Sequence, residues 1–117
     1  MRARLKSLDC DAITVPLAQW NPDATDFGLS LRAMIGPADG EGVESFTITV
    51  CTPGWLAAQM CDGDMRAGTH TIFVKSYNYP ALLRFIERAV QRVEAPTWRE
   101  LAAKLDFLGH WEFAKYD

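Results

Sequence analysis

Hydrophobic and polar residues alternate strictly in two segments of the first half of the chain. Every second residue is apolar over residues 27–35, and the same pattern returns over residues 45–51. A period of two is typical of a strand with one buried face. Residues 36–42 between them contain three glycines and one proline. These two strands are therefore predicted to form a hairpin.

Two further strands are expected beside this hairpin. Residues 2–8 alternate basic side chains with smaller or apolar ones, which suits an edge strand protected by positive charge. Residues 69–75 are predicted to form a third strand of the hairpin sheet. Residues 9–25 show no sustained period and are interpreted as an irregular connection, with Trp20 as its anchor.

Helical signals follow the second strand of the hairpin. A brief helix is predicted over residues 52–60, with Thr52 as its cap and Pro53 at its first position. A longer helix opens at residues 78–80, and its apolar stripe consists of Leu82, Ile86, Ala89, Val90 and Val93. On another face of this helix, basic residues recur every four positions, at Arg84, Arg88 and Arg92.

The last helix has the clearest boundaries. Thr97 and Glu100 form a capping box, in which each side chain satisfies a free backbone N–H of the first turn. Apolar residues then recur at helical spacing, and Gly109 is expected to end the helix in a left-handed conformation. Three aromatic residues follow, and burial of their rings is predicted to hold the C-terminus against the core: Trp111, Phe113 and Tyr116.

The order of these elements, strands first and helices last, favours an α+β fold. We predict an antiparallel sheet of about four strands, covered on one face by two C-terminal helices, with a short helix after the third strand. Residues 1–117 fit a single domain. The chain lacks an apolar run long enough to span a membrane and the apolar core of a signal peptide, so a cytoplasmic protein is expected.

Charge is distributed unevenly along the chain, whose formal net charge is −3. Between Asp9 and Asp64 there are nine acidic residues and a single basic one, Arg32, whereas the remainder carries eleven basic and six acidic residues. Such a split can speed the encounter with an oppositely charged partner and disfavours nucleic acid. Alternatively, acidic residues gather in turns because they are soluble there and Asp has turn chemistry.

No set of residues qualifies as a catalytic, cofactor or metal site. Cys10, Cys51 and Cys61 form no CxxC pair, and the two histidines, His70 and His110, are far apart in sequence. The glycine-rich segment 36–42 lacks the Lys-Ser/Thr ending of a phosphate loop. A small hydrolase or transferase that pairs Cys51 or Cys61 with a histidine stays open as an alternative.

Several segments resemble the bacterial immunity protein family 8. They are Glu44-Ser45-Phe46, Val50-Cys51-Thr52-Pro53 with Trp55-Leu56, Thr97-Trp98-Arg99-Glu100-Leu101, and Trp111-Glu112-Phe113 with Tyr116 near the end. The Trp-Glu-Phe ending after a helix that contains tryptophan is the most specific of them. Members of the family are antidotes encoded beside toxins of polymorphic and contact-dependent inhibition systems.

The resemblance implies a cytoplasmic protein without enzymatic activity that binds the C-terminal domain of a cognate toxin. It implies no catalytic residue, cofactor, nucleic acid or membrane partner, and it leaves the oligomeric state open; an oligomerisation scaffold is a further alternative. A carboxylate-rich surface would fit the basic cleft of a nuclease toxin. The candidate toxin-binding residues are Asp23, Asp26, Asp39, Glu41, Glu44, Trp55, Asp62 and Asp64. The residues expected to be structural are Ser45, Phe46, Trp98, Trp111, Glu112 and Phe113.

Overall fold

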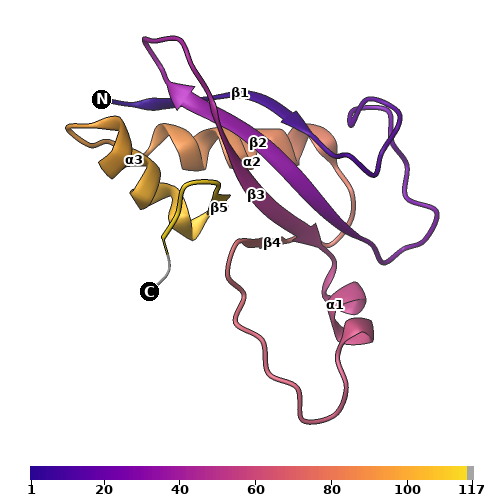
Figure 1. The fold of residues 1–117 in the computed structure, drawn as a ribbon. Coiled ribbons are helices and arrows are strands. Elements are labelled where there is room, and N and C mark those ends of the chain that lie inside the picture. The colour runs from indigo at the N-terminus through magenta and orange to yellow at the C-terminus, as the bar shows by residue number, and fades with distance from the viewer. Residues whose placement is uncertain (116–117) are drawn as a thin grey trace.

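The computed structural model describes residues 1–115, which contain one sheet and three α-helices (Figure 1). The strands are β1 (Ala3–Asp9), β2 (Gly28–Pro37), β3 (Glu44–Cys51), β4 (Thr71–Phe73) and β5 (His110–Trp111). The helices are α1 (Pro53–Gln59), α2 (Tyr79–Gln91), α3 (Trp98–Lys104) and the short 3-10 helix η1 (Leu105–Phe107). The fold is α+β, as the order of the predicted elements indicated.

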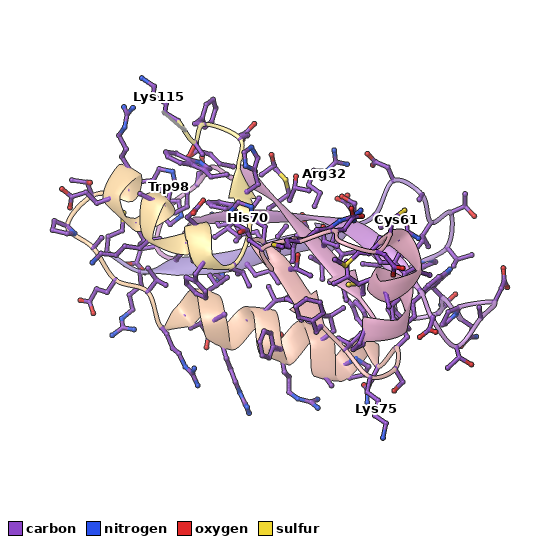
Figure 2. All side chains as sticks on the ribbon, turned by 90° about the horizontal axis from the view of Figure 1, so that it is seen from below. Arg32, Cys61, His70, Lys75, Trp98 and Lys115 are labelled. Carbon is purple, nitrogen blue, oxygen red and sulfur yellow. The ribbon has the colours of Figure 1, made fainter. Side chains whose placement is uncertain are left out.

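The predicted hairpin of β2 and β3 lies at the centre of the sheet, and β1 pairs antiparallel with β2. Leu31 lies opposite Ile48, and both side chains are buried, whereas Arg32 and Thr47 on the other face are exposed. Arg32 lies on the side of the sheet away from α2 (Figure 2). The strict alternation thus reflects a sheet with one face packed on the core and one face in solvent.

Two short strands share the outer edge of β3. β5 pairs antiparallel with the first half of β3, with Trp111 opposite Phe46, and β4 pairs parallel with the second half, with Phe73 opposite Cys51. The predicted strand over residues 69–75 is therefore shorter than expected and runs parallel to β3. After β3 the chain passes through α1 and a loop before it returns to the sheet. This crossover permits a parallel pair, which a hairpin turn cannot form.

The helix starts that the sequence predicted are confirmed. Thr52 caps α1, since its hydroxyl accepts the backbone N–H of Trp55 over 3.3 Å, and Pro53 follows at the first position. Asn78 caps α2 in the same way, and the buried face of α2 presents Leu82, Ile86 and Val90 to the core. None of the helices in the described residues is long and apolar enough to cross a membrane.

α3 begins where predicted but does not end as predicted. Thr97 caps it, since the hydroxyl accepts the backbone N–H of Glu100 over 3.2 Å. The prediction for Gly109 is wrong, because this residue does not have a positive φ. A Cβ at Gly109 would instead lie 2.9 Å from Ile48 Cγ1 and 3.2 Å from Phe46 Cβ. Glycine is required there because the backbone passes directly against β3.

The C-terminal aromatic residues are only partly buried in the core. Trp111 is 9% exposed and stacks on Phe46, with ring centroids 6.4 Å apart. Phe113 contacts Trp111 in a T-shaped arrangement but is 56% exposed, so the prediction that it closes the core is wrong. It follows β5 and has no strand opposite it to cover its ring. The prediction for Tyr116 lies outside the described residues.

Candidate partner-binding surfaces

The carboxylates proposed to bind a partner fall into two groups at opposite ends of the β2–β3 hairpin. Asp39, Glu41 and Glu44 belong to the turn and to the start of β3, whereas Asp23, Asp26, Asp62 and Asp64 lie in the loops that flank α1. β2 is ten residues long, and a strand rises about 3.3 Å per residue, so the two ends are about 30 Å apart. They do not form one continuous acidic face.

The group at the hairpin turn is partly engaged within the protein. Asp39 and Glu41 are exposed, but Lys6 Nζ donates to the carbonyl groups of Gly40 and Gly42 over 2.6 and 3.1 Å. This ammonium group lies at the turn and offsets its negative charge. The carboxylate of Glu44 is half-buried and accepts a hydrogen bond from Trp98 Nε1. Glu44 therefore has a structural role that its sequence position did not indicate.

At the other end of the hairpin, two loops bring carboxylates to either side of α1. The carboxylate of Asp26 lies against Gly54 in the first turn of α1, where a Cβ would overlap its oxygens. The ring of half-buried Trp55 covers Gly28 in a similarly close contact. Asp62 and Asp64 lie in the exposed loop that follows α1. Asp23 is exposed in the other loop, which precedes β2. Trp55 is thus packed against Gly28 at the start of β2.

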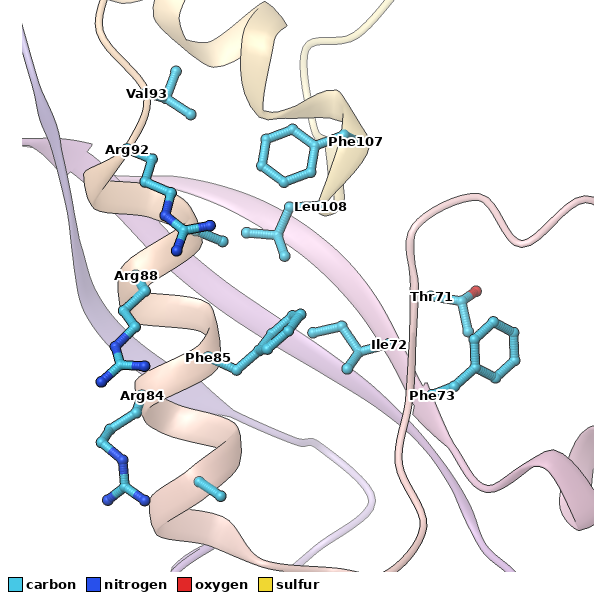
Figure 3. A pocket seen from close by; sticks show the side chains of 12 residues that line it. Thr71, Ile72, Phe73, Arg84, Phe85, Arg88, Arg92, Val93, Phe107 and Leu108 are labelled. Carbon is cyan, nitrogen blue, oxygen red and sulfur yellow. The ribbon is translucent and has the colours of Figure 1, made fainter.

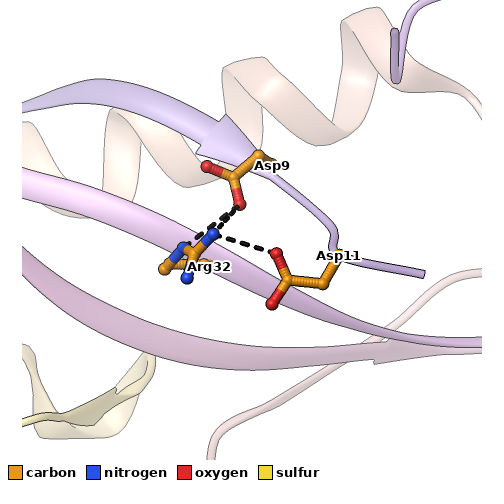
Figure 4. Close-up of polar contacts among 3 residues, drawn as sticks. All are labelled: Asp9, Asp11 and Arg32. Carbon is orange, nitrogen blue, oxygen red and sulfur yellow. Dashed lines mark hydrogen bonds and ion pairs between the residues drawn. The ribbon is translucent and has the colours of Figure 1, made fainter. Parts of the chain in front are cut away.

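The single basic residue of the acidic half is paired on the open face of the sheet. Arg32 lies 3.1 Å from Asp9 and 2.9 Å from Asp11, and both contacts join its Nη2 to a carboxylate oxygen (Figure 4). The hydrogen bond to Asp9 and the charges of both carboxylates raise the pKa of Arg32 above its usual value. These contacts are exposed, so they hold β1 to β2 only weakly.

An apolar groove lies between α2, β4 and η1, and the sequence did not predict it. Its volume is about 800 Å³, and Ile72 and Leu108 are buried at its floor. Two large aromatic side chains project into it: Phe85 from α2 is 56% exposed, and Phe107 from η1 is 63% exposed. Figure 3 shows Phe85 directed from α2 toward Ile72 of β4. Phe73, on the far side of β4, completes the rim.

Three arginines run along the α2 side of this groove. Arg84, Arg88 and Arg92 are exposed and lie in one row down the helix (Figure 3). None of them forms an ion pair within residues 1–115. A sequence signal for the groove existed: Phe85 and Phe107 are large apolar residues that lie outside the apolar stripes of their helices.

Cys51 and Cys61, the cysteines of the possible hydrolase or transferase, lie in different surroundings. Cys51 is fully buried, and burial raises the pKa of its thiol, which disfavours the nucleophilic thiolate. Cys61 is exposed in the loop after α1, and no cysteine lines the groove. His70 Nε2 lies 3.0 Å from Asp106 Oδ1, and the rings of His70 and His110 contact each other. The described residues contain no cluster that could hold a metal ion.

The expected structural residues gather around the start of β3. The backbone N–H of Ser45 donates to Glu112 Oε1 over 2.9 Å, and the N–H of Glu112 donates to the Ser45 carbonyl over 3.0 Å. Phe46 is fully buried beneath Trp111, and Trp98 is half-buried. Phe113 contacts Trp111 from outside. These residues thus join β3, α3 and β5 in one region.

Comparison with known proteins gives a family for the chain. No curated protein and no solved structure matches it significantly. The family model described as Immunity protein 8 matches residues 3–116, which is nearly the whole chain. The matched region includes every strand and helix described above, among them the contacts of Ser45 with Glu112 and of Phe46 with Trp111. The chain belongs to the Immunity protein 8 family.

Proposed function

We propose that this protein neutralises the toxin domain encoded beside it, by binding that domain in the cytoplasm and without catalysing a reaction. The observation that carries the proposal is the family match over residues 3–116. Membership of an immunity protein family implies a toxin as partner. The high pKa of the buried Cys51 thiol and the location of Cys61 away from the groove lend no support to a cysteine-dependent enzyme.

The toxin is proposed to be a nuclease of a polymorphic or contact-dependent inhibition system, whose basic cleft receives carboxylates of this protein. Of the two acidic groups, the one that flanks α1 is the better candidate. It collects four exposed carboxylates from the loops before β2 and after α1, and none of them pairs with a cation within residues 1–115: Asp23, Asp26, Asp62 and Asp64. At the hairpin turn Asp39 and Glu41 are likewise unpaired within residues 1–115, but only these two carboxylates are exposed, because Glu44 is half-buried and bonded to Trp98.

Cell survival and direct binding test the general proposal. Expression of the neighbouring toxin domain should stop growth, and co-expression of this protein should restore it. Calorimetry with the two purified proteins should then give a dissociation constant well below micromolar. No rescue together with no binding at micromolar concentration would overturn the proposal.

The acidic contribution has a matched pair of variants. The double variant Asp62→Lys/Asp64→Lys should slow association with the toxin about tenfold or more at low salt, because opposite charges steer the encounter. The double variant Asp39→Lys/Glu41→Lys changes the net charge equally and should leave the rate nearly unchanged. Equal association rates for both variants and the wild type would contradict the proposed role of the acidic loops and leave the immunity function standing.

A further inference from the structure

We propose that the groove between α2, β4 and η1 is the apolar centre of the toxin interface. It would hold a segment of the toxin polypeptide whose apolar side chains are edged by carboxylates. This inference rests on the proposed function and adds to it the part of the surface that provides most of the affinity. The acidic loops that flank α1 would then provide rate and orientation.

Two aromatic rings of the groove are largely exposed to solvent. Phe85 and Phe107 keep 56% and 63% of their surface in solvent although they lie over the buried side chains of Ile72 and Leu108. Contiguous apolar surface of this kind marks binding sites on soluble proteins, because leaving it in water is unfavourable. A partner that covers both rings removes this surface from water and anchors in a pocket that already exists.

Charge defines the chemistry of the occupant. Arg84 and Arg88 lie on α2, and Arg92 is its C-cap residue, so the three guanidinium groups follow the groove for about two helical turns, or about 12 Å. They lack ion-pair partners among residues 1–115. Guanidinium groups bind carboxylates in two-point contacts and are enriched with aromatic residues in interface centres. An apolar segment with carboxylates along one edge is complementary to this arrangement.

The groove also adjoins the acidic end of the molecule. Phe73 forms its rim across β4, and a Cβ at Gly68, in the loop that carries Asp62 and Asp64, would lie 3.4 Å from the Phe73 ring. One partner can therefore cover the groove and reach the loop after α1. The negative net charge of the chain, −3, disfavours RNA as the occupant, although aromatic and arginine side chains also bind RNA.

The test uses the full-length protein and the toxin domain encoded beside it. Phe85→Ala/Phe107→Ala should raise the dissociation constant about 100-fold, as expected for two anchoring residues, whereas Phe113→Ala, which removes an equally exposed ring outside the groove, should change it less than about twofold. Arg88→Glu should raise the dissociation constant about tenfold or more, whereas Arg99→Glu on α3, with the same change of charge, should not. Circular dichroism checks that each variant is folded.

The outcomes separate this inference from the function on which it rests. Absence of toxin binding by the wild type overturns both. Wild-type binding with unchanged affinity in Phe85→Ala/Phe107→Ala and in Arg88→Glu overturns the groove and leaves the immunity function standing. Two other occupants would also overturn it. One is RNA: a 20-nucleotide RNA would bind the wild type and bind Arg88→Glu more weakly, while the affinity for the toxin would be the same in both. The other is a second copy, if sedimentation finds a dimer that the phenylalanine variants dissociate without effect on toxin affinity.

Discussion

Ser45 and Glu112 are joined by two hydrogen bonds that fix the end of the chain to the start of β3. The Ser45 N–H donates to Glu112 Oε1 over 2.9 Å, and the Glu112 N–H donates to the Ser45 carbonyl over 3.0 Å. The two residues are 67 positions apart in sequence. The carboxylate thus extends the ladder between β3 and β5 by one side-chain bond beyond the paired residues.

Removal of this carboxylate should weaken the C-terminal attachment. We expect Glu112→Ala to lower the free energy of unfolding by about 1–2 kcal/mol, because the Ser45 N–H loses a charged acceptor at an exposed site. Glu112→Gln keeps an acceptor oxygen and should lose less than half as much. Urea unfolding followed by circular dichroism measures both, and equal stability of Glu112→Ala and wild type would contradict the structural role.

Trp111 should contribute more to stability than any other aromatic residue near the C-terminus. Trp111→Ala is expected to cost about 3–5 kcal/mol, since it empties a buried site against Phe46. Trp111→Phe should cost less, because it keeps a ring on Phe46 and removes an indole N–H that has no acceptor within residues 1–115. Phe113→Ala, at a half-exposed site, should cost about 1 kcal/mol or less. Chemical unfolding of the three variants tests this order.

The contact of Trp98 with Glu44 should appear as a coupling between α3 and β3. Trp98→Phe removes the donor and Glu44→Ala the acceptor, while the double variant loses the bond only once. The losses of unfolding free energy in the two single variants, added together, should therefore exceed the loss in the double variant by about 0.5–3 kcal/mol. Additive effects would indicate that the half-buried carboxylate is held by solvent instead.

Gly109 should tolerate no larger side chain. Gly109→Ala places a Cβ 2.9 Å from Ile48 Cγ1 and 3.2 Å from the Thr47 carbonyl oxygen, and we expect a loss of about 1–3 kcal/mol. Gly40→Ala is a suitable control, because the nearest atom would be 3.4 Å away, on the Pro37 side chain. Thermal unfolding that shifts equally for both variants would contradict the close contact with β3.

Tyr77 should make stability depend on pH at the alkaline end. Burial raises its pKa to about 12, and its hydroxyl donates to the Leu17 carbonyl over 2.6 Å. The ordinary value, about 10, applies to the unfolded chain. The folded state thus retains the proton longer, so this contribution is complete below pH 10 and is lost as pH rises from about 10 to 12. Unfolding free energies of wild type and Tyr77→Phe should converge over this range; a constant difference would contradict the shift.

The local features of the sequence determined the elements and their faces. Alternation over residues 27–35 and 45–51 established two strands and the side of each that is buried, because successive side chains of a strand point to opposite faces. Thr52 and Thr97 marked helix starts, because their hydroxyls bond to N–H groups only three residues away. The family motif likewise consists of short segments of consecutive residues, so the resemblance could be recognised without a structure.

Only the tertiary structure decided how distant segments meet. The length of β2 separates Asp39 from Asp26, and the crossover after β3 makes β4 parallel. The packing of β3 against Gly109 explains a glycine that looked like a helix end. The groove joins Phe85, Ile72 and Phe107 from three elements. The pattern of polar and apolar positions marks Phe85 and Phe107 as lying outside their apolar stripes, but their meeting at one groove depends on strand pairing and helix packing across many residues.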